Sequence, residues 1–298
     1  MTMSNAAMNI SSRLIRLLSA IVLATLVSLI FSACSAVKLG YNQLPDLGYW
    51  WLDGYFDFNE VQTLRMRPEI ISLLQWHRKE ELPKLAASLQ KVKAAMPSAM
   101  TGSQVCAVFG ELRGLFNNVV QRGLPTAAEL APTLTVEQLQ RLESKFAKGN
   151  DTYSRDYLRG SAAERTDKRF KQAVDRAETF YGTLGEAQLA AVRKGLEASG
   201  FDAEVNNKER LRRQNDALAM LRGMRGQNAA NAYASLQAYV QRSNSSPDSA
   251  YRTYALRVTQ DSCNAFATTH NSTTPEQRAK AVLVLKGYEA DMRSLAAQ

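Results

Sequence analysis

Three carboxylates lie close together near the start of the chain, beside two tryptophans. Asp53, Asp57 and Glu60 fall within eight residues of one another and follow Trp50 and Trp51. Carboxyl pairs are the groups with which glycoside hydrolases protonate and attack a sugar linkage, and aromatic rings commonly stack on the sugar. This cluster therefore supports a glycan-active enzyme as one hypothesis. Its alternative is a set of surface acids neutralised by neighbouring arginines.

The two histidines predict neither a catalytic nor a metal centre. His77 is followed by Glu80 and Glu81, but no third ligand for a transition metal is evident. His270 falls at the end of an expected helix, where a positive charge is favoured. The sequence has no Walker A loop, dinucleotide fingerprint, G-x-S-x-G or H-E-x-x-H motif. We therefore expect no metal, no cofactor and no enzymatic activity.

Positive charge is densest between residues 205 and 226. Arginine favours bidentate contacts with phosphate or carboxylate, so this stretch is a candidate anion-binding surface, and a solvated helix face is the alternative. The chain as a whole carries a net charge of +9. The six candidate residues are Lys208, Arg210, Arg212, Arg213, Arg222 and Arg225.

The first 33 residues have the organisation of an export signal. Arg13 and Arg16 precede an almost wholly apolar run at 17–31, and two small residues, Ser32 and Ala33, follow it. The run is close to the length of a transmembrane helix, so a retained anchor is the rival interpretation.

The end of this run resembles a bacterial lipobox. It reads Phe31-Ser32-Ala33-Cys34, with Phe31 in place of the usual leucine. The resemblance implies that Cys34 is lipidated and becomes the first of 265 mature residues, which carry a net charge of +7 once Arg13 and Arg16 are removed. Acyl chains would then anchor the protein in the membrane without a spanning helix. The residue after Cys34 is Ser35 rather than an aspartate, which by resemblance to lipoproteins generally implies an outer-membrane location facing the periplasm.

Export also bears on the other two cysteines. Cys106 and Cys263 form an even number in an oxidising compartment, so we expect either a disulfide between them or two buried free thiols. Nucleic acid is excluded as a partner by the same compartment. Anionic envelope components or proteins remain as candidate partners.

The elements that would position these residues are all expected to be helices. Apolar residues recur at spacings of three and four, and repeated capping boxes of the type Thr-x-x-Gln mark helix starts. The fold class is therefore all-α, an elongated multi-helix bundle of antiparallel hairpins. A loop is expected at 123–134. The predicted helices span residues 59–95 (kinked or broken at Pro68 and Pro83), 102–122, 135–159, 161–182, 186–198, 202–222, 227–243, 247–270 and 275–297.

Three segments make up the predicted domain organisation. A signal peptide at 1–33 precedes the lipidated cysteine and an aromatic-rich segment at 34–58, and a single helical domain follows at 59–298. The aromatic rings either pack onto the helical body or form a belt at the lipid headgroups. Acidic residues among the rings favour packing, because an anionic membrane surface would repel them.

Several motifs resemble a family of uncharacterised bacterial lipoproteins built on a domain of unknown function. The Leu-Thr-x-x-Gln units are similar to those of Spy-type periplasmic chaperones. Together these observations predict a lipid-anchored envelope protein with a structural or binding role. A chaperone-like holdase and a peptidoglycan-active enzyme are the alternatives. The motifs that resemble the lipoprotein family are Tyr41, Asn42, Leu44, Pro45, Trp50, Trp51, Asp53 and Tyr55, then Thr273 to Arg278, with Tyr288, Glu289, Asp291 and Arg293.

Overall fold

The computed structural model describes residues 37–298, and the regular structure in this part of the chain is entirely helical. The all-α prediction is therefore confirmed, whereas the predicted signal peptide and Cys34 lie outside the described residues. The chain divides after Leu44, and the packing below concerns residues 45–298. The elements are α2 (Leu44–Phe56), α3 (Glu60–Trp76), η1 (His77–Glu81), α4 (Leu82–Ala95), α5 (Gly102–Leu130), η2 (Ala131–Thr133), α6 (Val136–Tyr153), η3 (Ser154–Leu158), α7 (Ala162–Tyr181), α8 (Glu186–Glu197), α9 (Ala203–Met224), α10 (Ala229–Asn244), α11 (Ser249–Asn271) and α12 (Pro275–Ala296).

Capping boxes start five of these helices, as the sequence predicts. In each, the capping side chain accepts a hydrogen bond from the third helical backbone N–H, and the third side chain accepts one from the cap. Gly185 has no side chain to contribute, so only Gln188 Oε1 acts there, accepting from Gly185 N at 2.8 Å. The five capping residues are Asn59, Thr101, Thr135, Ser161 and Thr274.

Proline does not end two of the helices in which it lies. Pro68 lies within α3, and Pro125 lies within α5, which continues to Leu130. The loop predicted at 123–134 is therefore wrong. A proline inside a helix costs about 3 kcal/mol. Leu124 and Leu130 are both buried in the core, and burial of such side chains contributes roughly 1.5–3 kcal/mol each, which offsets that cost.

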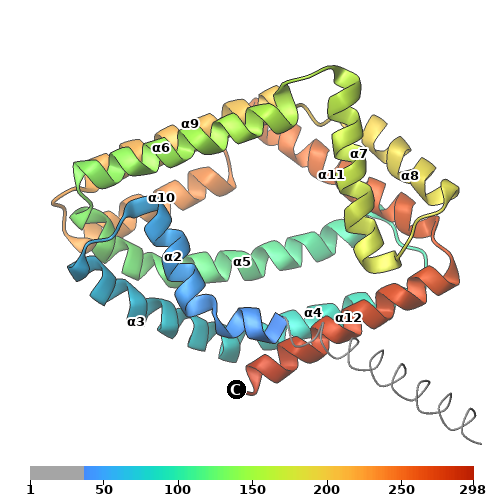
Figure 1. The fold of residues 1–298 in the computed structure, drawn as a ribbon, viewed down its shortest axis with the longest axis horizontal. Helices are drawn as coiled ribbons and strands as arrows, with labels where there is room; N and C mark the ends of the chain where they lie inside the picture. Colours follow the sequence, from blue (N-terminus) through green and yellow to red (C-terminus); the bar gives the residue numbers. More distant parts are fainter. Residues whose placement is uncertain (1–36) are drawn as a thin grey trace, which may run out of the picture. The chain divides into compact units, whose positions relative to one another are not determined.

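Helix packing joins segments that are far apart in the sequence. Three pairs of consecutive helices pack together: α4 with α5, α7 with α8, and α9 with α10. The most extensive pairings are long-range, however, with α12 against α4, α11 against α8, and α5 against both α10 and α11 (Figure 1). The expected hairpins therefore account for only part of the packing.

The aromatic segment is divided between the core and solvent. Tyr49 is buried, and Phe56 and Phe58 pack against a core cluster formed by α5, α6, α9 and α10. Trp50 and Trp51 are 60% and 62% exposed. The prediction that the rings pack onto the helical body thus holds for part of the segment and fails for these two tryptophans.

Two buried contacts hold α11 in place. A disulfide joins Cys106 on α5 to Cys263 on α11, with 5.4 Å between the Cα atoms. His270, near the end of α11, is fully buried, and its Nδ1 and Nε2 lie 2.8 Å from Tyr181 Oη and Ser98 O. Burial lowers the pKa of His270, so the expected positive charge at this helix end is wrong. These contacts fix α5 and α11, which form two walls of the site described next.

Candidate anion-binding cleft

Two aspartates start the helices that carry the site. The Asp202 carboxylate accepts hydrogen bonds from the first backbone N–H groups of α9, and Asp248 does the same for α11. The short connection from α10 to α11 contains Ser246, which is buried. This geometry brings one face of α9 against the end of α10 and the start of α11.

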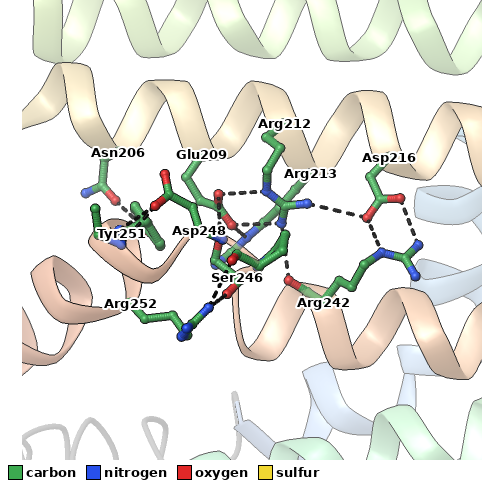
Figure 2. Close-up of polar contacts among 12 residues, drawn as sticks. Asn206, Glu209, Arg212, Arg213, Asp216, Arg242, Ser246, Asp248, Tyr251 and Arg252 are labelled. Atoms are coloured by element: carbon green, nitrogen blue, oxygen red, sulfur yellow. Dashed lines mark hydrogen bonds and ion pairs between the residues drawn. The ribbon is translucent and has the colours of Figure 1, made fainter.

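Glu209 on α9 is the centre of an arginine network (Figure 2). Its carboxylate, 5% exposed, accepts from Arg212 at 2.8 and 2.9 Å, from Arg213 at 2.8 Å and from Ser246 Oγ at 3.1 Å. Burial raises the pKa of Glu209, but the hydrogen bonds from Arg212, Arg213 and Ser246 outweigh it and lower the pKa to about 2. Glu209 is therefore ionised throughout the physiological range.

Asp216, almost two turns further along α9, extends the network to α10. Arg242 binds its carboxylate through two parallel hydrogen bonds of 2.9 and 2.8 Å, and Arg212 lies at 3.5 Å. Arg212 also donates to the Arg242 carbonyl oxygen at 3.2 Å. Three guanidinium groups thus surround two carboxylates, which fastens α9 to α10 and leaves one unit of positive charge in excess.

A cleft of about 480 Å³ opens beside this network, between α5, α9, the end of α10 and α11. Arg113, Arg213 and Arg252 line it, and among the residues that the structure describes, no aspartate or glutamate belongs to its lining. Arg252 is oriented by hydrogen bonds to the Ser246 and Pro247 carbonyl oxygens at 2.6 and 3.0 Å. The cleft therefore concentrates positive charge from three separate helices.

The walls of the cleft combine aromatic and hydroxyl groups. Phe116, Tyr251 and Tyr254 supply rings, and the Tyr251 hydroxyl donates to Asn206 Oδ1 at 3.1 Å, which orients its ring. Ser243 also lines the cleft, and within the described chain its hydroxyl is buried without a hydrogen-bond partner. A buried hydroxyl without a partner is uncommon in folded proteins, which makes Ser243 an unusual member of the lining.

The six predicted anion-binding residues do not form one surface, because successive positions on α9 point to different neighbours. Arg212 and Arg213 bind Glu209, whereas Arg210 donates to Asn150 on α6 at 2.9 Å and Arg222 pairs with Glu143 on α6 at 2.9 Å. Lys208 and Arg225 are exposed. Of the six, only Arg213 lines the cleft.

Sequence reasoning did not find Arg113, Arg252 and Ser243. Each belongs to a different helix, Arg113 lies 130 positions before Ser243, and no local motif connects the three. The sequence offers one signal for Arg252, which lies five residues after the predicted helix start at Ser246-Pro247. That signal is too common to mark a site.

The acidic residues of the glycan-active hypothesis have other roles. Asp53 Oδ1 accepts from Phe58 N at 2.8 Å and ends α2, and Asp57 Oδ2 lies 3.2 Å from Arg141 Nη1. Glu60 is exposed in the first turn of α3. Two of the three carboxylates therefore fix the chain locally.

Residues 37–298 offer neither a metal site nor a membrane span. No group of three or more histidine, cysteine, aspartate or glutamate side chains there could hold a metal ion. No helix in the same range is both long and apolar enough to cross a membrane. His77 is half-buried in η1, and burial lowers its pKa.

The fold and site together define an all-α protein whose charged clusters fasten its helices and line one cleft. The chain belongs to the family of unknown function DUF6279, whose model matches residues 54–252. The match includes Arg113, Arg213 and Arg252. No curated protein and no solved structure matches the chain.

Proposed function

We propose that the chain is a lipid-anchored protein of the bacterial cell envelope, attached through Cys34, with a binding rather than a catalytic role. The anchor rests on the sequence pattern at Phe31 to Cys34, and the resemblance to lipoproteins favours the periplasmic face of the outer membrane. The ligand that the cleft fits best is an anionic envelope component that carries phosphate groups.

The observation that carries the binding role is the composition of the cleft. Arg113, Arg213 and Arg252 bring three positive charges to a space of about 480 Å³, and one guanidinium is already oriented by backbone oxygens. Guanidinium groups suit phosphate because their planar fork donates two parallel hydrogen bonds. The aromatic walls can also contact the organic part of a ligand, so a phosphate ester fits better than a free ion.

The same composition disfavours acid–base catalysis. Efficient proton transfer needs a group that titrates near the operating pH. The ionisable groups of the lining within the described chain are arginines and tyrosines, and burial raises the pKa of Tyr251 above its usual value. The cleft can therefore hold a charged ligand more readily than it can exchange a proton with one.

Thermal unfolding with pyrophosphate as the probe tests the cleft. A ligand that binds the folded state raises Tm, and the shift grows with the logarithm of the ligand concentration relative to Kd. We expect pyrophosphate to raise the Tm of the unmodified protein, with an effect that weakens as salt is added. The Arg113→Gln/Arg252→Gln variant should show no such shift.

Arg225→Gln is the matched control, because Arg225 is exposed on the same protein and lies outside the cleft. It should retain the full pyrophosphate shift. Equal shifts in all three proteins, or no shift in the unmodified one, would contradict the proposed ligand class. A photo-crosslinking residue at Leu256, which lines the cleft, would then identify the natural ligand in the envelope.

A further inference from the structure

We infer that α2 also docks directly on the lipid surface, through an outward side formed by Leu47, Trp50 and Trp51 that we call the tryptophan face. This inference rests on the proposed attachment at Cys34. It adds a second, non-covalent contact between the protein and the bilayer and thereby orients the helical body.

The three residues share one side of the helix. Positions i, i+3 and i+4 lie next to one another on a helix surface, and Leu47, Trp50 and Trp51 follow this spacing. They are 47%, 60% and 62% exposed. The two tryptophans alone leave on the order of 300 Å² of ring surface in solvent, which reaches the size of the largest apolar patch on a typical soluble monomer, and such patches are often functional.

The opposite side of α2 is firmly held, so this exposure does not come from a loosely attached helix. Tyr49 is buried, and its hydroxyl lies 2.7 Å from Thr63 Oγ1 on α3. The Arg67 guanidinium stacks over the Tyr49 ring at 4.0 Å from its centroid. The fold thus fixes α2 with both tryptophans directed outward.

The acidic residues near the tryptophan face do not oppose a membrane contact as strongly as their sequence suggests. Asp46 pairs with Arg67 at 3.0 Å, and Asp57 pairs with Arg141 at 3.2 Å. The Asp53 carboxylate accepts a hydrogen bond from the Phe58 backbone N–H. Positive partners therefore offset two of the three charges that would be repelled by anionic headgroups.

The short chain between Cys34 and α2 favours lipid as the partner that covers the tryptophan face. Leu47 lies thirteen positions after Cys34, and a chain of that length spans at most about 45 Å. A tether this short keeps α2 at high effective concentration beside the bilayer. Tryptophan combines a large apolar ring with one N–H donor, which suits the region between headgroups and acyl chains.

Fluorescence quenching in vesicles tests the inference on the mature, lipidated protein. The chain has three tryptophans, so Trp76→Phe reports on Trp50 and Trp51, whereas Trp50→Phe/Trp51→Phe reports on Trp76. Both proteins are placed in phosphatidylethanolamine and phosphatidylglycerol vesicles that contain a phosphatidylcholine brominated near the headgroup end of its acyl chains. We expect about a twofold loss of emission for Trp76→Phe and little loss for the double variant.

The intact mass of each sample is measured first, which separates the two claims. A protein without acyl groups on Cys34 would overturn the proposed attachment. A lipidated protein in which Trp50 and Trp51 escape bromine quenching, or are quenched no more than Trp76, would overturn docking alone. Shielding of Trp50 and Trp51 from aqueous acrylamide that depends on protein density, without bromine quenching, would mean that a second copy covers the face and would also overturn it.

Discussion

The arginine network on α9 and the tryptophan face on α2 differ in whether their side chains find partners within the fold. Around Glu209, hydrogen bonds join a buried carboxylate to partly buried arginines, so the charge stabilises contacts between helices. On α2, Trp50 and Trp51 remain in solvent, where burial would be favourable. Side chains that lack partners within the fold are therefore a better guide to binding surfaces than charge density or hydrophobicity alone.

The comparison predicts a large stability loss when the buried carboxylate is neutralised. Glu209→Gln removes a buried charge and leaves Arg213 without its charge partner and Arg212 with only Asp216, 3.5 Å away, so unfolding should become easier by about 3–5 kcal/mol. Urea unfolding measures this directly. Glu143→Gln is the control, because Glu143 and Arg222 are both about half exposed and should contribute less than about 1 kcal/mol. Similar losses in both variants would contradict the structural role of the network.

Removal of the disulfide should have the next largest effect, because it joins α5 and α11, two walls of the cleft. Cys106→Ala/Cys263→Ala opens a loop with a sequence separation of 157 residues, and the loss of a disulfide typically costs about 2–4 kcal/mol. The urea midpoint of the variant, compared with that of the unmodified protein before and after reduction, measures the loss. If reduction leaves the midpoint of the unmodified protein unchanged, the bridge does not form in solution.

Acid should weaken the protein in two steps. Because the pKa of His270 is lowered by burial, the unfolded chain takes up a proton first, and stability falls as the pH drops below about 6.5. The pKa of Glu209 is lowered from 4.5 to about 2, so its contribution of roughly 3 kcal/mol is complete above pH 4.5 and is lost between pH 4.5 and 2. Urea midpoints measured from pH 7 to 2 should show the second step in the unmodified protein. A second step of full size in Glu209→Gln would assign it to other groups.

The smallest expected effect concerns the tryptophan face. Trp50→Ser/Trp51→Ser removes two largely exposed rings, of which Trp51 packs against Tyr55 with 4.9 Å between the ring centroids, so the free energy of unfolding in solution should change by no more than about 1 kcal/mol. Tyr49→Ala, one position away but buried, should cost several kcal/mol, roughly 3–5 by analogy with buried aromatic residues. Equal losses in the two variants would mean that the tryptophans stabilise the fold itself.

Local signals in the sequence predicted the helix starts but not the arrangement of the helices. Thr101 and Thr135 reveal caps because the capping box is complete within four residues. Pro125 misleads, because burial of Leu124 and Leu130, which no local pattern reveals, outweighs its cost to α5. Long-range pairings such as α4 with α12 depend on the whole chain.

The candidate site was predictable in composition only. The arginines of α9 are evident in the sequence, but Asp216 on the same helix binds Arg242, which lies 26 positions away. The cleft also contains Arg113 and Arg252, which belong to other helices. In the sequence, Asp46 and Asp57 disfavour a membrane contact. In the structure they pair with Arg67 and Arg141, which offsets their charge. The role of each region therefore depends on the partners of its side chains, which the residue types alone do not reveal.

The intact mass of the protein extracted from bacterial membranes tests the central claim, lipid attachment at the cell envelope, most directly. The account predicts a chain that begins at Cys34, contains 265 residues and carries additional acyl mass on that cysteine. The Cys34→Ser protein should lose the acyl mass and leave the membrane fraction. An unlipidated chain that remains membrane-bound, or an N-terminus other than Cys34, would contradict the account.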